Sequence, residues 1–178
     1  MTTHQKKEQK KIGVLMITLM WIIIFALLAF FFSDQLNKQK NPNQSPTTIE
    51  SSDGIKSLVL QRNRQGHYVS NGKINNVPVV FMLDTGATDV SIPEKIAQKL
   101  DLKKGSSAIY QTANGPVKVS MTRLQHISLG DISLNNVRAT INPGFHSNEI
   151  LLGMSFLKHL EFSQRGNKLT LKQYPEGL

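Results

Sequence analysis

The stretch Val79-Val80-Phe81-Met82-Leu83-Asp84-Thr85-Gly86-Ala87 decides how this chain is interpreted. Its continuous apolar run predicts a strand buried on both faces, and that strand ends at an acid. An aspartate in such a place is costly unless hydrogen bonds or a bound proton compensate its charge. Thr85 offers a hydroxyl, and Gly86 permits a sharp turn or a close approach. The pattern therefore indicates a carboxylate placed for acid–base chemistry.

A structural role for Asp84, as a buried acid that only caps nearby backbone amides, is the alternative. Asp-Thr-Gly is short enough to occur by chance, so it needs support from the rest of the chain. Two later segments supply that support. Asn114-Gly115, between alternating strand residues, is a strong hairpin signal, and an apolar-apolar-Gly segment follows at Leu151-Leu152-Gly153.

Taken in this order, the three segments resemble the catalytic loop, flap hairpin and apolar-apolar-Gly segment of the retropepsin-like aspartic proteases, particularly their membrane-anchored bacterial branch. The resemblance covers about residues 54 to 173. It implies that Asp84 is catalytic and that its loop is supported by Thr85, Gly86 and Ala87. The flap residues that it implies to cover substrate are Tyr110, Gln111, Thr112, Asn114 and Gly115. Leu151, Leu152 and Gly153 would pass behind the loop in a structural role and lead into a short helix.

The same resemblance implies a mechanism and a partner. Aspartic proteases hydrolyse peptide bonds with water activated by two carboxylates that share one proton, without a metal or other cofactor. This chain has one Asp-Thr-Gly. The second carboxylate would come from another copy, so the resemblance implies a homodimer with Asp84 of each subunit on the two-fold axis. The substrate would be a peptide or a protein.

The N-terminal part carries a long uncharged segment from Ile12 to Phe32. At helical rise it spans about 31 Å, against a hydrocarbon core of about 30 Å. We expect a single transmembrane helix. A cleaved signal peptide is the rival, but its apolar core is usually shorter and ends at small residues, whereas this one ends at Phe30-Phe31-Phe32.

Charge around this segment predicts its orientation. Four lysines lie before it within residues 6–11, while Lys38 and Lys40 follow at a greater distance. The positive-inside rule then places the N-terminus in the cytoplasm and the rest outside the inner (cytoplasmic) membrane, in a periplasm where there is one. The expected organisation is a basic tail over residues 1–11, a transmembrane helix over 12–32, a flexible linker over 33–53 and the protease-like domain over 54–178.

Composition argues against several other classes of function. The net charge of +9 comes partly from the N-terminal lysines, and the remaining basic residues are dispersed without interleaved aromatics, so we do not expect nucleic-acid binding. There is no cysteine, which excludes thiol nucleophiles and thiolate metal sites. The five histidines show no metal-ligand spacing and are interpreted as surface or satisfied core residues. The remaining acids of the domain that we expect at the surface are Asp89, Glu94, Asp101 and Asp131.

From residue 54 onward, short strands with Gly and Asn turns predict an all-β fold, a small closed barrel of the retropepsin type with one or two short helices. The helices are expected over 93–100 and 154–160. Strands are expected over 57–61, 67–69, 77–83, 123–129, 132–141 and 169–171, with turns at Asn71-Gly72, Asn75-Asn76 and Gly130-Asp131.

Two other classes of function stay open from the sequence. One is a catalytically silent, membrane-tethered peptide-binding or scaffold module, which the intact Asp-Thr-Gly disfavours. The other is a structural anchor of the envelope, which the flap-like hairpin disfavours. Retroviral relatives form a charged contact near the dimer interface where this chain has Thr88 and Met154. We therefore expect a dimer that is weak in solution and favoured by the anchor, although the strand at 169–171 could interleave with its twin.

Overall fold

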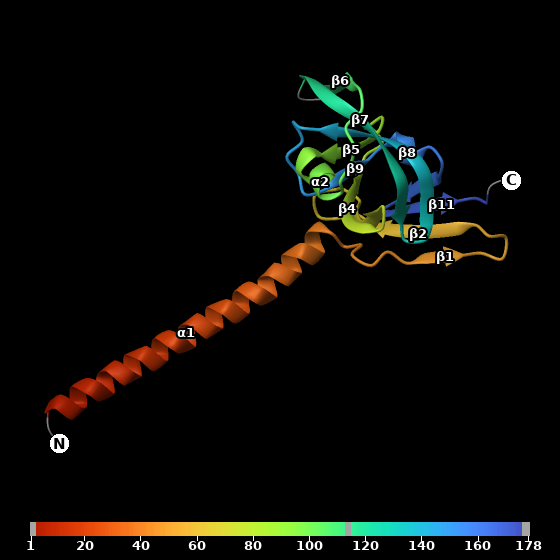
Figure 1. The fold of residues 1–178 in the computed structure, drawn as a ribbon. Helices are drawn as coiled ribbons and strands as arrows, with labels where there is room; N and C mark the ends of the chain where they lie inside the picture. Colours follow the sequence, from red (N-terminus) through yellow and green to blue (C-terminus); the bar gives the residue numbers. More distant parts are fainter. Residues whose placement is uncertain (1–2, 113–114, 176–178) are drawn as a thin grey trace. The chain divides into compact units, whose positions relative to one another are not determined.

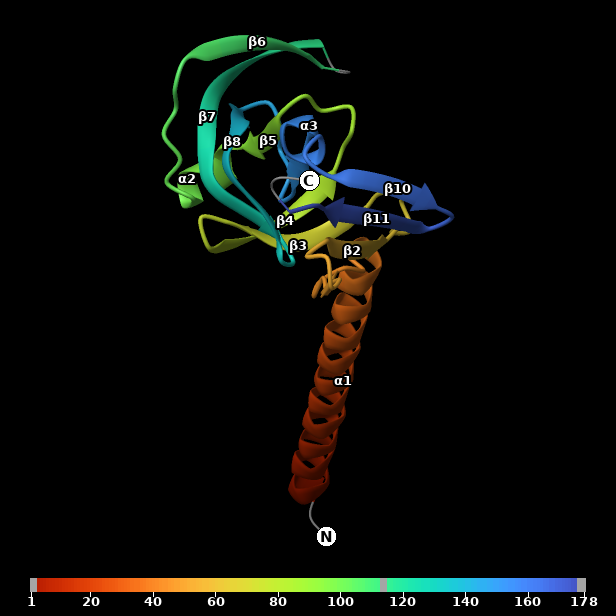
Figure 2. The same cartoon turned by 90° about the vertical axis from the view of Figure 1, so that its right-hand side faces the viewer.

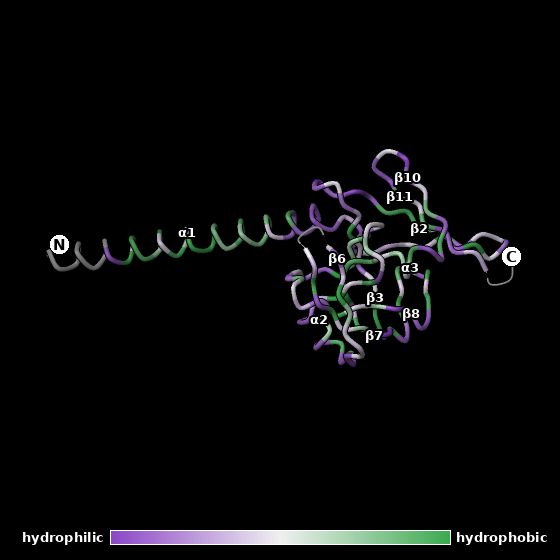
Figure 3. The backbone as a smooth tube through the Cα atoms, turned by 90° about the horizontal axis from the view of Figure 1, so that it is seen from above, coloured by the Kyte–Doolittle hydropathy of each residue, from purple (hydrophilic) through white to green (hydrophobic). Residues whose placement is uncertain are grey.

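A computed structural model describes residues 3–112 and 115–175. The chain divides into two compact units, Met1–Gln39 and Lys40–Leu178. Helix α1 (Thr3–Lys40) makes up the first unit (Figure 1). Within the described residues it is the one helix long and apolar enough to cross a membrane. Most apolar side chains between Ile12 and Phe32 are exposed along it, and Figure 3 colours this stretch as mainly hydrophobic.

Helix α1 continues beyond the expected span and into the expected linker. Residues 33–40 contain no proline or glycine, and Lys38 Nζ forms an ion pair with Asp34 Oδ2 at 2.8 Å, one helical turn apart. Pro42 then disfavours helical geometry at the residue before it. The helix therefore ends at Lys40.

Six strands of the second unit form a closed ring. In spatial order they are β3 (Val69–Ile74), β4 (Val77–Leu83), β9 (Ile150–Leu152), β5 (Val90–Pro93), β8 (Ile132–Asn142) and β7 (Gly115–Leu129). Pairing of β3 with β7 closes the ring, and Figure 2 shows the long β7 curving around it. β6 (Ser107–Thr112) pairs with β7 outside the ring. The prediction of a small closed barrel is confirmed.

A second sheet of four antiparallel strands lies against the same core. Its order is β1 (Thr48–Glu50), β2 (Lys56–Gln61), β11 (Lys168–Gln173) and β10 (Glu161–Arg165). Leu58, Leu60 and Leu171 are fully buried and join the barrel's apolar cluster. β11 has a neighbour on each side within its own chain. It therefore has no free edge for the partner strand that the sequence analysis considered.

The segment after α1, expected to be flexible, is tied to the domain by hydrogen bonds. The Nδ2 group of Asn43 donates to the carbonyl oxygens of Gln61 at 2.9 Å and Val69 at 2.7 Å. Its Oδ1 accepts from the Gln61 N–H at 2.7 Å. Asn41 and Asn43 are both buried. The amide side chain of Asn43 satisfies backbone groups as a neighbouring strand would, so residues 41–50 are ordered where polar composition suggested a coil.

Most predicted local elements are present, and one turn prediction is wrong. Asn75 and Asn76 have φ of 48° and 67° and form the expected turn between β3 and β4. Asn71 and Gly72, however, lie inside β3. A Cβ on Gly72 would lie 2.4 Å from the Ser128 carbonyl oxygen and 2.5 Å from the Phe81 ring. The glycine therefore marks a close approach and not a turn.

The two expected helices are present as short elements, α2 (Glu94–Lys99) and α3 (Met154–Leu157). The burial of β4 differs from the expectation. Phe81 is fully buried, but Val79, Val80, Met82 and Leu83 are only partly covered within one chain. The strand therefore has one face in the core and one that this chain alone does not cover.

Candidate active site

Asp84 follows directly on the last residue of β4, on a tight loop. β9 runs parallel to β4, with Leu83 beside Leu152. The Asp84 N–H donates to the Leu152 carbonyl oxygen at 3.2 Å, and the Ala87 N–H donates back to the Asp84 carbonyl oxygen at 3.2 Å. The Gly86 N–H donates to Asp84 Oδ1 at 2.9 Å. The carboxylate is thus oriented by its own loop and remains partly accessible.

The apolar-apolar-Gly segment packs against this loop. The N–H groups of Met154 and Ser155 donate to the carbonyl oxygens of Ala87 at 2.8 Å and Thr88 at 2.9 Å. A Cβ on Gly153 would lie 2.3 Å from the Asp89 carbonyl oxygen and 2.6 Å from that of Ala87. Only a residue without a side chain fits there. The segment leads into α3, as the sequence predicts.

The flap-like hairpin is formed by β6 and the start of β7. Tyr110 lies opposite Val117, and Thr112 opposite Gly115. Thr112 Oγ1 donates to the Gly115 carbonyl oxygen at 2.7 Å, and Gly115 has a φ of 101°. Gln111 and Thr112 are exposed, and so is Ile109, an apolar residue that the sequence analysis did not single out. Asn114 lies outside the described residues.

Asp89 contradicts the expectation of a surface acid. Its side chain is fully buried, and Arg138 Nε lies 2.6 Å from its Oδ1. The Tyr110 hydroxyl donates to its Oδ2. Burial first, and then the bond to Asp89, raise the pKa of Tyr110. The hydrogen bond to Asp89 is also the main cause that raises the pKa of the Arg138 guanidinium.

The other acids expected at the surface fall into two groups. Asp101 and Asp131 are exposed, as expected. Glu94 is partly buried and forms an ion pair with Lys104. Asp89 differs from all three because its partners come from β6 and β8, which are distant in sequence.

Comparison with known proteins agrees with this geometry. Residues 70–159 match the model of the family described as "gag-polyprotein putative aspartyl protease". The chain belongs to this aspartyl protease family. A crystal structure of a retropepsin-like aspartic protease from Rickettsia conorii superimposes with a TM-score of 0.55 at 28% identity, over 72% of this chain and 95% of that chain. The retropepsin fold is thereby shown.

Two curated proteins also match this member of the family in sequence. One is an uncharacterised Sinorhizobium protein from the cobV 5' region, 32% identical over 71% of this chain and 56% of its own length. The other is an uncharacterised protein of Rickettsia prowazekii, 29% identical over 87% of this chain and 69% of its own length. The chain therefore spans little more than half of the first relative.

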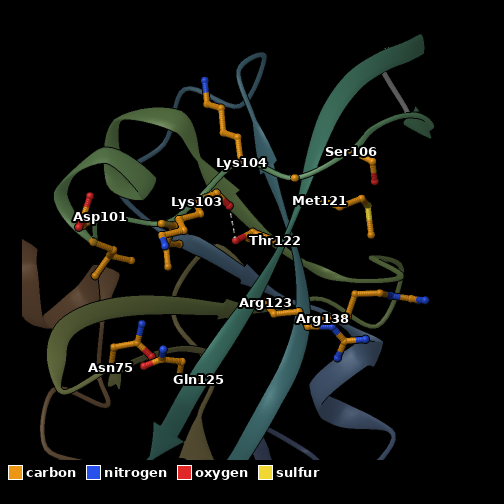
Figure 4. A pocket seen from close by; sticks show the side chains of 13 residues that line it. Asn75, Asp101, Lys103, Lys104, Ser106, Met121, Thr122, Arg123, Gln125 and Arg138 are labelled. Atoms are coloured by element: carbon orange, nitrogen blue, oxygen red, sulfur yellow. Dashed lines mark hydrogen bonds between the residues drawn. The ribbon is translucent and has the colours of Figure 1, made fainter.

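Two hollows of this aspartyl protease domain lie away from Asp84. One of about 800 Å³ lies between residues 100–106 and β7 and is lined by Lys103, Lys104, Arg123 and Arg138 among others (Figure 4). Thr122 Oγ1 donates across it to the Lys103 carbonyl oxygen at 2.8 Å. A second hollow, of about 500 Å³, lies between α2 and residues 143–148. Neither of these two hollows includes the catalytic-type loop.

No group of three or more His, Cys, Asp or Glu side chains in the described ranges 3–112 and 115–175 is arranged to hold a metal ion. Thr85 and Gly86, next to Asp84, are exposed in the single chain. They are free to meet another protein surface.

Proposed function

We propose that this chain is a membrane-anchored aspartic endopeptidase that is active as a homodimer. The observation that carries the proposal is the position of Asp84, at the end of a strand and on a loop braced by the Leu152-Gly153 segment. The chain contains one Asp-Thr-Gly, so a single copy supplies half of an aspartic dyad. The exposed Thr85 and the partly uncovered β4 support pairing with a second copy.

In this mechanism the two Asp84 carboxylates face each other and share one proton. Two adjacent like charges cannot both ionise easily, so one carboxylate stays protonated while the other is charged. The charged one takes a proton from water as the water attacks the peptide carbonyl carbon. The protonated one donates its proton to the carbonyl oxygen. The apparent pKa values belong to the pair and not to either subunit.

The anchor and the location are further parts of the proposal. Helix α1 is long and apolar enough to span a bilayer, and lysines precede its apolar part. We propose a cytoplasmic tail over residues 1–11, a span over 12–32 and an extracytoplasmic protease domain. The compact second unit begins at Lys40, so the domain is best taken to start there and not at residue 54.

A reporter that is active only outside the cytoplasm tests this topology. Fused after Leu178, it should be active and should stay with the membranes after washing. A shortened soluble product would indicate a signal peptide instead.

Replacement of Asp84 by Asn tests the chemistry. Asp84→Asn is nearly isosteric but cannot share the catalytic proton, so peptide cleavage by the purified protein should fall at least about a thousandfold, the scale expected when an essential acid–base group is lost. The measurement is turnover of a fluorogenic peptide library, with thermal unfolding as the check of the fold.

Asp101→Asn is the matched control. Asp101 is an exposed acid of the same domain with a φ of 50°, a conformation that asparagine tolerates. This control should keep full activity. Cleavage that persists in purified Asp84→Asn would rule the proposal out.

A further inference from the structure

A buried carboxylate connects the flap strand to the loop that carries Asp84. Asp89 lies on that loop, directly before β5, and its side chain is fully buried. Tyr110 reaches it from β6, and Arg138 reaches it from β8. We call these three residues the Tyr110–Asp89–Arg138 brace.

The brace compensates the unfavourable burial of the Asp89 carboxylate. An isolated charge out of water is strongly unfavourable, whereas hydrogen bonds from a guanidinium and a hydroxyl stabilise the ionised form. Arg138 keeps about half of its side chain exposed, at 52%, so its own charge remains hydrated. Asp89 therefore depends on Arg138 more than Arg138 depends on Asp89.

Tyr110 is the member of the brace that can move with the flap. β6 pairs with β7 and with no other strand among the described residues, so backbone hydrogen bonds fix it along one edge only. Its neighbour Ile109 points to solvent, while Tyr110 on the opposite face turns inward to Asp89. The hydrogen bond from the Tyr110 hydroxyl to Asp89 thus links the flap to the catalytic-type loop.

We infer that Tyr110 is a positioning residue that holds the flap against the Asp84 loop through Asp89, with Arg138 fixing the carboxylate. The inference rests on the proposed function for its catalytic consequence, but not for the contact itself. The raised pKa of Tyr110 supports it, because the hydroxyl keeps its proton and remains a donor at neutral and acidic pH.

The first test measures the flap without using activity. In the full-length Asp84→Asn protein, hydrogen exchange of peptides covering residues 107–112 and 115–121 is compared with and without Tyr110→Phe. Loss of the hydroxyl should speed exchange there by about tenfold, the scale of one charge-assisted hydrogen bond. Tyr174→Phe is the matched control, because its hydroxyl also donates to a carboxylate, Glu161, but in the second sheet. It should leave the flap unchanged.

The second test uses the active chain. Tyr110→Phe should lower kcat/KM by about tenfold, mainly through a higher KM, because a looser flap covers bound substrate less well. Its unfolding temperature should stay close to that of Tyr174→Phe. Asp89→Asn keeps the shape and one acceptor of the carboxylate. Its rate of flap hydrogen exchange should lie between those of the parent and of Tyr110→Phe. If Tyr110→Phe does not fold, Asp89→Asn replaces it in both tests.

The outcomes separate the two proposals. Flap exchange that is unchanged in Tyr110→Phe overturns the brace, whatever the activity. Faster flap exchange with Tyr110→Phe, together with no peptide cleavage by the chain that keeps Asp84, supports the brace and refutes the proposed protease function. A fall in kcat alone, with KM unchanged, would show that Tyr110 does not act through substrate covering.

Discussion

At the scale of single residues, Gly153 is fixed by the backbone around it. The two atoms closest to a Cβ at this position are carbonyl oxygens of the catalytic-type loop, at 2.3 Å and 2.6 Å. Neither belongs to a flexible side chain, so an added methyl group must displace the loop itself. The glycine of the apolar-apolar-Gly segment is therefore needed for space and not for an unusual dihedral angle, since its φ is −88°.

Gly153→Ala should therefore damage both stability and activity. We expect a loss of roughly 1–3 kcal/mol in the free energy of unfolding, as for other overpacked sites, and a large fall in peptide cleavage because Asp84 shifts with the loop. Chemical denaturation and peptide turnover measure the two effects. Gly13→Ala, in helix α1 with open space around its Cβ, is the control and should change neither. Unaltered unfolding in Gly153→Ala would mean that the loop tolerates the methyl group.

Single residues also show how far the sequence predicts the site. The loop that carries Asp84 and the packing of Gly153 against it could be predicted, because both follow a recognisable local pattern. Asp89 could not, because its partners Tyr110 and Arg138 are 21 and 49 residues away. Its burial depends on which strands the barrel brings together, and no local pattern carries that information.

The titration of Tyr110 follows the same contacts. Its pKa is raised in the folded protein, first by burial and then by Asp89. The protonated hydroxyl therefore stabilises the fold fully below the ordinary tyrosine pKa of about 10. This contribution is lost as the pH rises through the raised value. The Tyr110 hydroxyl should thus keep its proton and remain a donor at neutral pH.

At the scale of elements, the segment between α1 and β2 is part of the domain. Its asparagines replace the backbone partners that a regular strand would offer to β2 and β3, and Asn43 pairs with Ser70 as an isolated bridge. Polar composition predicted a coil because the sequence has almost no large apolar residue there. Amide side chains can be buried when each polar atom finds a partner, and these do.

Asn43→Ala should expose this dependence. It removes the bonds to Gln61 and Val69 and leaves buried backbone groups unpaired, so we expect a loss of roughly 2–3 kcal/mol of unfolding free energy. Thermal or chemical unfolding of the Lys40–Leu178 fragment measures it. Asn148→Ala, at an exposed asparagine, should be neutral. Equal stability of the two variants would show that the segment is only loosely attached.

At the scale of the whole molecule, the fold class was predictable and the pairing of subunits is not visible in one chain. Alternating strands and turn residues determine a closed barrel largely through local geometry. The dimer is different. Asp89 finds its cation, Arg138, inside the same chain, and β11 is paired on both sides within its own sheet. Neither feature contributes an obvious bond to a second copy.

We therefore expect a weak dimer in solution. The fragment Lys40–Leu178 should sediment mainly as a monomer when dilute, and its specific activity should rise with concentration. The full chain in lipid vesicles should be more active per molecule, because confinement to one surface raises the effective concentration of the subunits. Analytical ultracentrifugation and peptide turnover measure both. A tight fragment dimer at nanomolar concentration, with constant specific activity, would contradict this expectation.

The four-stranded sheet that each chain completes by itself has a consequence for control of the proposed protease activity. A subunit that needs no partner strand can fold and persist alone, while holding only half of the proposed dyad. Under the proposed function, such a solitary subunit would be inactive until a second copy binds to it. At low surface density, proteolysis would then grow with the square of the number of copies in the membrane, so about a twofold change in expression would change it about fourfold.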